Sequence, residues 1–220
     1  METVFSIEMP EHSVHVSAIL EVPEKARAIL VLAHGAGAGM RHPFMAQLAK
    51  ALQREKIGTL RFQFPYMEKG SKRPDRPKIA TAAVAAAVRE ASAHTGKLPL
   101  AAGGKSFGAR MTTQAAAQGL LPQVEKIVCF GFPLHAPKKP SLIRAEHFDD
   151  LRIPVLCLQG TRDDLADPAL MRKVIAKHPR RLKMQMVEGA DHAFHVLKSS
   201  GRTDEDVLCE IAIAASRFLR

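Results

Sequence analysis

The sequence contains no tryptophan and a single tyrosine, and only three of its 220 residues are cysteines. Cys129, Cys157 and Cys209 lie far apart in apolar segments, and their spacing is not that of metal ligands. Such a small, odd number argues against a disulfide framework and favours reduced, buried thiols. We therefore expect a cytoplasmic protein.

Long apolar runs are also missing. No apolar run approaches the ~20 residues that a membrane-spanning helix needs. The N-terminal segment METVFSIEMPEHS has neither a basic start nor a continuous apolar stretch, so we expect no signal peptide and no membrane association. No cluster of His, Asp or Glu has metal-ligand spacing, which predicts a protein without a metal or an organic cofactor.

Positive charge, by contrast, is abundant, and the formal net charge is +10. The densest basic segment, KGSKRPDRPK at residues 69–78, has no aromatic residue on which a base could stack. We interpret it as a solvated, proline-containing loop, and we expect no nucleic-acid partner. Binding to DNA with a strong salt dependence would contradict this interpretation.

Apolar segments of strand length alternate with segments of helical periodicity, and apolar residues make up 46% of the chain. The run AILVLA, for example, is typical of a strand buried on both faces. The alternation predicts the α/β fold class, with a mostly parallel central sheet, helices on both faces and a single domain over residues 1–220. The expected strands are residues 4–7, 14–22, 28–33, 58–64, 98–102, 126–130, 155–158 and 182–187, and the expected helices are residues 43–55, 79–94, 107–118, 168–177 and 204–219.

The loop GGKSFG at residues 103–108 fits two chemistries. Its GGKS part resembles the end of a phosphate-binding loop, but that loop needs a glycine where this chain has Pro99. Gly104, Ser106 and Gly108 instead match the Gly-x-Ser-x-Gly turn that presents a nucleophilic serine between a strand and a helix. Small residues on either side let this strained turn avoid its neighbours. We therefore expect a nucleophile at Ser106.

A nucleophilic serine needs a histidine base and an acid that orients the base. The expected strand at 155–158 leads into Asp163 and Asp164, and the expected strand at 182–187 leads into His192, in the chain order Ser, Asp, His. Ligand sites of parallel sheets form at the carboxyl ends of the strands, so these residues are expected near Ser106.

With these motifs the sequence resembles the α/β-hydrolase superfamily, and within it the small dienelactone-hydrolase-like branch, many of whose members have no assigned substrate. Dienelactone hydrolases proper use a cysteine nucleophile, whereas this chain has Ser106. The resemblance thus implies the fold and not the dienelactone substrate. The matching segments extend over nearly the whole chain and are LAHGAGAG (32–39), RFQFPYME (61–68), GGKSFGAR (103–110), PVLCLQGTRD (154–163) and GADHAF (189–194).

The resemblance implies a catalytic triad in which Ser106 attacks a carbonyl group, His192 takes its proton and Asp163 fixes the tautomer of the imidazole. Asp163 is preferred because the family's acid lies three residues past the strand-end glycine, and Asp164 is the alternative. His195 is the competing base, but it lies beyond the GADH corner and is expected on the final crossover.

The oxyanion hole is expected at two backbone amides. One is the amide of Phe107, directly after the nucleophile, and the other is the amide of Ala36, with Gly37 as the alternative. His34, in the same HGxG turn, is expected to hold this loop in place rather than to take part in catalysis.

Three further polar residues receive structural interpretations. Asp167 stands before a proline and is expected to cap the helix that follows. Lys105 is expected to be solvated or locally paired, and Arg110 is expected to form a structural salt bridge.

Only 24 residues, 131–154, separate the expected strand at 126–130 from the next one, and four of them are prolines. Proline breaks helices, so we expect one short helix near residues 142–151, no large cap and an open, shallow site. The sequence thus predicts a serine hydrolase of small-molecule esters or related acyl compounds that acts through an acyl-enzyme. The alternative is an α/β-hydrolase-fold protein that binds a ligand or partner without turnover.

Overall fold

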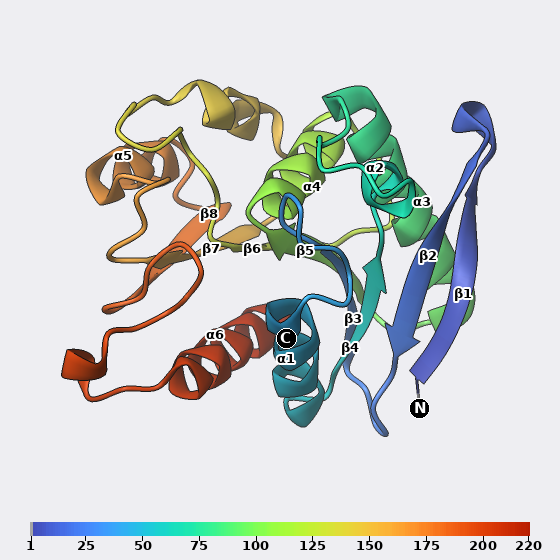
Figure 1. Ribbon diagram of the computed structural model, residues 1–220, viewed down its shortest axis with the longest axis horizontal. Helices are drawn as coiled ribbons and strands as arrows, with labels where there is room; N and C mark the ends of the chain where they lie inside the picture. Colours follow the sequence, from blue (N-terminus) through green and yellow to red (C-terminus); the bar gives the residue numbers. More distant parts are fainter. Residues whose placement is uncertain (1) are drawn as a thin grey trace.

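The computed structural model describes residues 2–220, and one sheet runs through them (Figure 1). The strands are β1 (Glu2–Met9), β2 (Val14–Glu21), β3 (Ala28–Ala33), β4 (Ile57–Phe62), β5 (Leu100–Lys105), β6 (Lys126–Phe130), β7 (Val155–Gly160) and β8 (Leu182–Val187). They lie in the order β1-β2-β4-β3-β5-β6-β7-β8. Strands β3 to β8 run parallel to their neighbours, while the hairpin of β1 and β2 joins β4 in the antiparallel sense. The predicted mostly parallel sheet is confirmed.

Helices cover both faces of the sheet, as predicted. The α-helices are α1 (Pro43–Arg54), α2 (Pro65–Glu68), α3 (Pro77–Thr95), α4 (Phe107–Ala117), α5 (Pro168–Lys177) and α6 (Asp204–Leu219), and the 3-10 helices are η1 (Pro10–His12), η2 (Ile143–Asp150) and η3 (Lys198–Ser200). Helices α1 and α6 lie side by side on one face, and α3 and α4 pack together on the other (Figure 1).

Strand β3 shows how the sequence builds a core on each face. All six of its residues are buried. Ile29 and Val31 belong to the core beneath α3 and α4, whereas Leu30 and Leu32 belong to the core beneath α1 and α6. Because alternate residues of a strand face opposite sides, a continuous apolar run is what a doubly covered strand requires.

Two boundaries near the predicted site differ from the expectation. The strand expected at residues 98–102 continues to Lys105 as β5, because glycine here does not end the strand but lets neighbouring backbone approach it. A Cβ atom at Gly103 would lie 2.2 Å from the carbonyl oxygen of Val128 on β6. The strand expected at residues 58–64 ends at Phe62, and Pro65 starts the short helix α2 instead.

The last two helices begin where their capping residues predict. Asp167 Oδ1 accepts a hydrogen bond from the Leu170 amide at 2.9 Å, which confirms the expected cap of α5. Thr203 and Asp206 form a reciprocal capping box at the start of α6. Local side-chain chemistry therefore sets both starts.

The connection between β6 and β7, residues 131–154, carries only the 3-10 helix η2. The helix expected at residues 142–151 is present in this tighter form. No large cap is built from these residues, as predicted, and Ser106 remains half-buried rather than enclosed.

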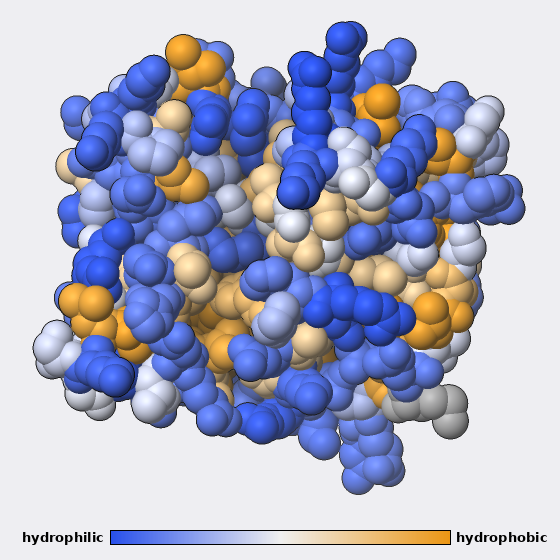
Figure 2. Space-filling view, in the orientation of Figure 1, coloured by the Kyte–Doolittle hydropathy of each residue, from blue (hydrophilic) through white to orange (hydrophobic). Residues whose placement is uncertain are grey.

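The face of the molecule seen in Figure 2 is largely hydrophilic. Figure 2 shows hydrophilic side chains over most of the face seen in Figure 1, in keeping with a chain in which charged residues make up 25%. Among residues 2–220, no helix combines the length and the apolar character needed to cross a membrane.

Candidate active site

Ser106 occupies a sharp turn between β5 and α4. Its backbone has φ 52° and ψ −113°, a conformation that is strained for a residue with a Cβ atom. A Cβ atom at Gly104 would lie 2.6 Å from the Ala33 carbonyl oxygen, and one at Gly108 would lie 2.3 Å from the same oxygen. Both positions therefore require glycine, and the two glycines let the turn project Ser106 from the sheet.

The structure brings Ser106, His192 and Asp163 together, and we refer to these three residues as the candidate triad. His192 Nε2 lies 2.8 Å from Ser106 Oγ, and His192 Nδ1 lies 2.7 Å from Asp163 Oδ2. In the arrangement that satisfies both contacts, Nδ1–H donates to the carboxylate and Nε2 accepts from the serine hydroxyl. The three residues follow β5, β8 and β7, so the carboxyl ends of three strands supply them.

Asp163 is held by more than the histidine. Only 5% of its surface is exposed. Oδ1 accepts the Leu165 amide at 2.8 Å, and Oδ2 also accepts a hydrogen bond from Gln159 Nε2. Gln159 is itself fully buried, and its Oε1 accepts the Phe132 amide at 3.0 Å. Sequence reasoning missed Gln159, although a lone amide in the apolar strand VLCLQG was a signal.

The two alternatives for base and acid lie outside this arrangement. Asp164 is exposed, and His192 bonds to Asp163 instead. His195 is exposed and lies 2.9 Å from Asp204, whose hydrogen bond and charge raise the pKa of His195. His195 thus belongs to the turn that leads into α6, as expected.

The HGxG loop lies against the serine turn. A Cβ atom at Gly35 would lie 3.8 Å from Ser106 Cβ. Within residues 2–220, the amides of Ala36 and Phe107 donate to no other protein group, whereas the Gly37 amide donates to Tyr66 Oη at 2.8 Å. Gly37, the alternative to Ala36, is therefore already engaged.

His34 fixes this loop, as expected. It is fully buried, its Nδ1–H donates to the Gly35 carbonyl at 2.7 Å, and its Nε2 accepts the Phe64 amide at 3.1 Å. Burial lowers the pKa of His34 to about 4, so the imidazole is neutral at pH 7. Its ring packs edge-on against Phe64, with centroids 4.9 Å apart.

The expectation for one charged neighbour holds in part, and that for another is wrong. Of the two states expected for Lys105, solvated or locally paired, the structure shows the second: the side chain is buried, and Nζ donates a hydrogen bond to the backbone carbonyl of His192. Arg110 does not form the expected salt bridge, because its charged neighbour is Arg144 rather than a carboxylate. Its Nε is buried without a hydrogen-bond partner among the described residues. The sequence pattern gave no sign of either environment.

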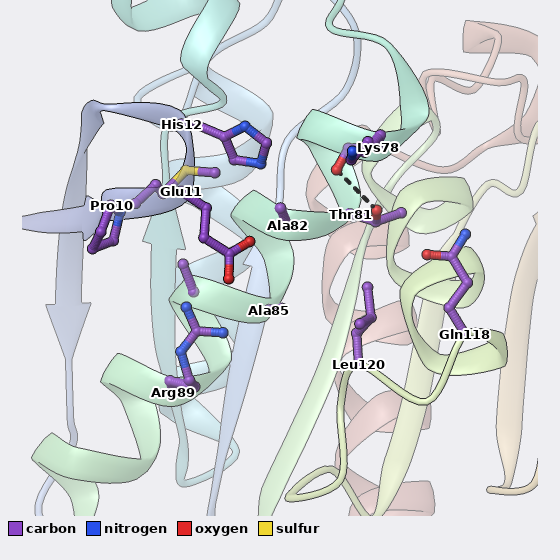
Figure 3. A pocket seen from close by; sticks show the side chains of 12 residues that line it. Pro10, Glu11, His12, Lys78, Thr81, Ala82, Ala85, Arg89, Gln118 and Leu120 are labelled. Atoms are coloured by element: carbon purple, nitrogen blue, oxygen red, sulfur yellow. Dashed lines mark hydrogen bonds between the residues drawn. The ribbon is translucent and has the colours of Figure 1, made fainter.

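A cavity of about 620 Å³ lies elsewhere, over α3, and contains none of the candidate triad. Figure 3 shows Glu11 and His12 on one side of it, Ala82 and Ala85 on the helix between, and Leu120 on the other side. Across residues 2–220, no three His, Cys, Asp or Glu side chains are grouped to hold a metal ion. The candidate triad therefore lies outside this cavity.

The family is shown by a comparison over most of the chain. A model described as an alpha/beta hydrolase domain matches residues 26–220. The chain therefore belongs to the α/β-hydrolase family, which confirms the resemblance inferred from its motifs.

Solved structures of similar proteins share the fold almost from end to end. A dienelactone hydrolase from Anabaena variabilis is 20% identical with a TM-score of 0.78, covering 99% of this chain and 95% of that one. An α/β serine hydrolase without a lid from Xanthomonas campestris is 17% identical with a TM-score of 0.76, covering 99% and 94%. An α/β serine hydrolase homologue from Coxiella burnetii is 20% identical with a TM-score of 0.76, covering 99% and 97%. Family and neighbours together support hydrolase activity.

Proposed function

We propose that the protein is a serine hydrolase that cleaves ester or related acyl bonds of small molecules. The observation that carries this proposal is the continuous hydrogen-bond chain from Ser106 Oγ to His192 at 2.8 Å and from His192 to Asp163 at 2.7 Å. This order of hydroxyl, imidazole and carboxylate is what activates a serine for attack on a carbonyl carbon.

In the first half of the reaction, Ser106 Oγ attacks the carbonyl carbon of the ester, and its proton passes to His192 Nε2. The tetrahedral oxyanion accepts hydrogen bonds from the free amides of Ala36 and Phe107. Collapse of this intermediate breaks the bond to the alcohol oxygen, which takes the proton from Nε2. The acyl group remains on Ser106 as an ester.

In the second half, His192 takes a proton from water, and the resulting hydroxide attacks the acyl carbon. Collapse releases the carboxylic acid and returns the proton to Ser106. Throughout, Asp163 remains ionised, holds Nδ1–H and stabilises the imidazolium that forms in each half. Gln159 and the Leu165 amide keep the carboxylate in place for this task.

The short connection after β6 supports small, activated esters as substrates. Without a large cap over Ser106, water is poorly excluded, and we expect modest rates and a broad substrate range. Free thiols at Cys129, Cys157 and Cys209 support a reducing compartment, and we propose the cytoplasm.

A pure binding protein would have no use for the strained backbone at Ser106, which costs on the order of 1–3 kcal/mol. The free amides of Ala36 and Phe107 likewise suit a developing oxyanion. These features favour turnover over the non-catalytic alternative.

Labelling with a fluorophosphonate probe tests the proposal. We expect one label, at Ser106 by peptide mapping, together with hydrolysis of p-nitrophenyl acetate that is lost in Ser106→Ala. Ser199→Ala, a change at an exposed serine, serves as the control and should keep both. A folded protein that hydrolyses esters but carries no label at Ser106 would show that the nucleophile is another residue.

A further inference from the structure

Lys105 places a buried positive charge directly before Ser106. It ends β5, and only 8% of its surface is exposed. Lysine is almost never buried to this degree without a partner, because its ammonium group loses its hydration. A specific environment must therefore hold it.

The ammonium lies where four segments meet. Nζ donates a hydrogen bond to the backbone carbonyl of His192. It lies 5.3 Å from the ring centroid of Phe194 and 5.8 Å from that of Phe44, within the range of cation–π attraction. The two rings stack with centroids 5.8 Å apart. At the end of β6, a Cβ atom on Gly131 would lie 2.9 Å from Nζ, so glycine there leaves room for the ammonium.

The ionisable groups that face Lys105 come from both strand-end loops of the candidate triad. Burial lowers the pKa of Lys105 to about 8, and the charges of Asp163 and Asp191 oppose this shift. His192 is the remaining titratable neighbour, through its carbonyl. The ammonium form therefore predominates at pH 7 and is lost within a pH range where most lysines stay charged.

We propose that Lys105 is a positioning residue for His192, which ties the backbone of that histidine to the end of β5 and so fixes the imidazole relative to Ser106. This inference rests on the proposed function. Asp163 holds the imidazole at Nδ1, while Lys105 holds the same residue through its carbonyl oxygen. The hydrogen bond from Lys105 to His192 joins residues that lie 87 positions apart in the sequence. It lies next to the contact between His192 and Ser106.

Loss of the positive charge on Lys105 should have opposite effects on turnover and on the stability of the fold. As the pH rises through about 8, the ammonium becomes a neutral amine, its hydrogen bond and cation–π contacts weaken, and turnover falls. The folded pKa lies below the ordinary value of 10.5, so the buried charge destabilises the fold at pH 7, and this cost declines as the pH rises from 8 toward 10.5. A lysine kept only for stability would not behave in this way.

Lys126 offers a matched control. It also donates to a backbone carbonyl, that of Phe218 at 2.9 Å, and lies 5.7 Å from the centroid of the Phe218 ring. However, it begins β6, at the opposite end of the strand from Gly131. Its substitution therefore tests loss of the same kind of contact away from Ser106.

The first experiment compares Lys105→Met with Lys126→Met on p-nitrophenyl acetate. Because a misplacement of about 1 Å costs on the order of 10²-fold, we expect Lys105→Met to lower kcat by that order, with KM within about twofold. It should also remove the fall in kcat above pH 8 and melt no lower than the wild type at pH 7. Lys126→Met should keep the wild-type kcat and pH profile. A Lys105→Met variant with unchanged kcat overturns the proposal.

The second experiment does not depend on turnover. Hydrogen–deuterium exchange of peptides covering residues 189–196 should be faster in Lys105→Met than in Lys126→Met. In the wild type, exchange there should also increase between pH 7 and pH 9 after correction for the intrinsic rate. Unchanged exchange in the wild-type series overturns the inference even if the variant fails to fold. Absence of both ester hydrolysis and a Ser106 label would instead refute the proposed function, and the exchange data would still decide the role of Lys105.

Discussion

The candidate triad and the cavity over α3 are two regions with different polar organisation. At the triad, Ser106 and His192 form a hydrogen bond although they lie 86 residues apart in the sequence. The hydrogen bond between His192 and Asp163 joins residues that lie 29 positions apart. In the cavity, the Thr81 hydroxyl donates only to the carbonyls of Pro77 and Lys78 on its own helix (Figure 3). The triad is built from long-range contacts, and this part of the cavity from local ones.

The difference teaches that hydrogen bonds between polar side chains of distant segments, rather than cavity volume, distinguish the candidate active site. Bringing polar side chains from three loops together costs chain entropy and desolvation. A buried group such as Asp163 is held against that cost by several hydrogen bonds. The cavity of about 620 Å³ is lined by alanines of α3 and also by polar side chains such as Glu11, Lys78 and Arg89. Among the described residues, no hydrogen bond or ion pair joins these polar side chains across the cavity.

The largest effect should come from removing the nucleophile or the base. Ser106→Ala and His192→Ala should each lower kcat/KM for p-nitrophenyl acetate on the order of 10⁴-fold, because in the proposed mechanism the two act in the same step. The double variant should be scarcely worse than either single one. Losses that multiply in the double variant would mean that the residues do not share a step.

The choice between the two aspartates should give an effect almost as large. Asp163→Asn keeps the shape but removes the charge that orients His192, so kcat should fall on the order of 10³ to 10⁴-fold. Asp164→Asn, at an exposed neighbour, should change kcat less than about twofold. Steady-state kinetics of the two variants check this, and the reverse ranking would move the acid by one residue.

The buried imidazole of His34 predicts a loss of stability in acid. Its folded pKa of about 4 lies below the ordinary 6.5, so its contribution is complete above pH 6.5 and is lost as the pH falls toward 4. The free energy of unfolding should fall by about 3 kcal/mol from this group. Urea unfolding of the wild type and of His34→Gln at pH 7 and pH 4.5 checks this. A pH dependence as steep in His34→Gln as in the wild type would contradict the assignment.

A smaller loss of kcat is expected when the loop that contains Ala36 loses a contact. Tyr66→Phe removes the acceptor of the Gly37 amide and frees the loop to shift from Ser106. We expect kcat to fall about tenfold, equivalent to about 1.4 kcal/mol of transition-state stabilisation, with little change in KM. Kinetics on p-nitrophenyl acetate measure the loss. Unchanged kcat would show that the loop holds its position without Tyr66.

The smallest effect is expected in the cavity over α3. Thr81→Val removes a local hydroxyl contact, and Leu120→Ser changes a partly exposed wall residue. Each should leave kcat and KM for p-nitrophenyl acetate within about twofold of the wild type, since neither touches the candidate triad. A loss beyond tenfold in a folded variant would break the contrast between the two regions.

The sequence predicted those parts of the molecule whose causes are local. The strand AILVLA, the cap at Asp167 and the glycines around Ser106 each carry their own reason for the structure they form. Strand-end positions then placed His192 and Asp163 near Ser106, because the carboxyl ends of parallel strands share one edge of the sheet.

Contacts between distant segments were not accessible in the same way. Lys105 meets the carbonyl of a residue 87 positions away, and Tyr66 meets Gly37 across 29 positions. Nothing in the local pattern around Lys105 distinguishes a buried lysine from a solvated one. The strand predicted at residues 98–102 also stops short of the end of β5 at Lys105. Glycine in a sequence can indicate either a turn or a close approach of neighbouring backbone, and the local pattern does not distinguish the two.

The turn at residues 136–139, in the connection after β6, makes this architecture open to domain insertion. Ala136 and Lys139 form a bridge, with the Lys139 amide donating to the Ala136 carbonyl at 3.1 Å, and residues 137–140 are exposed. Because the two ends of the turn already lie together, a guest module with adjacent termini adds little loop-closure entropy. The protein can therefore serve as a scaffold for changing substrate selectivity. A cap domain inserted at residues 136–139 would leave the candidate triad unchanged.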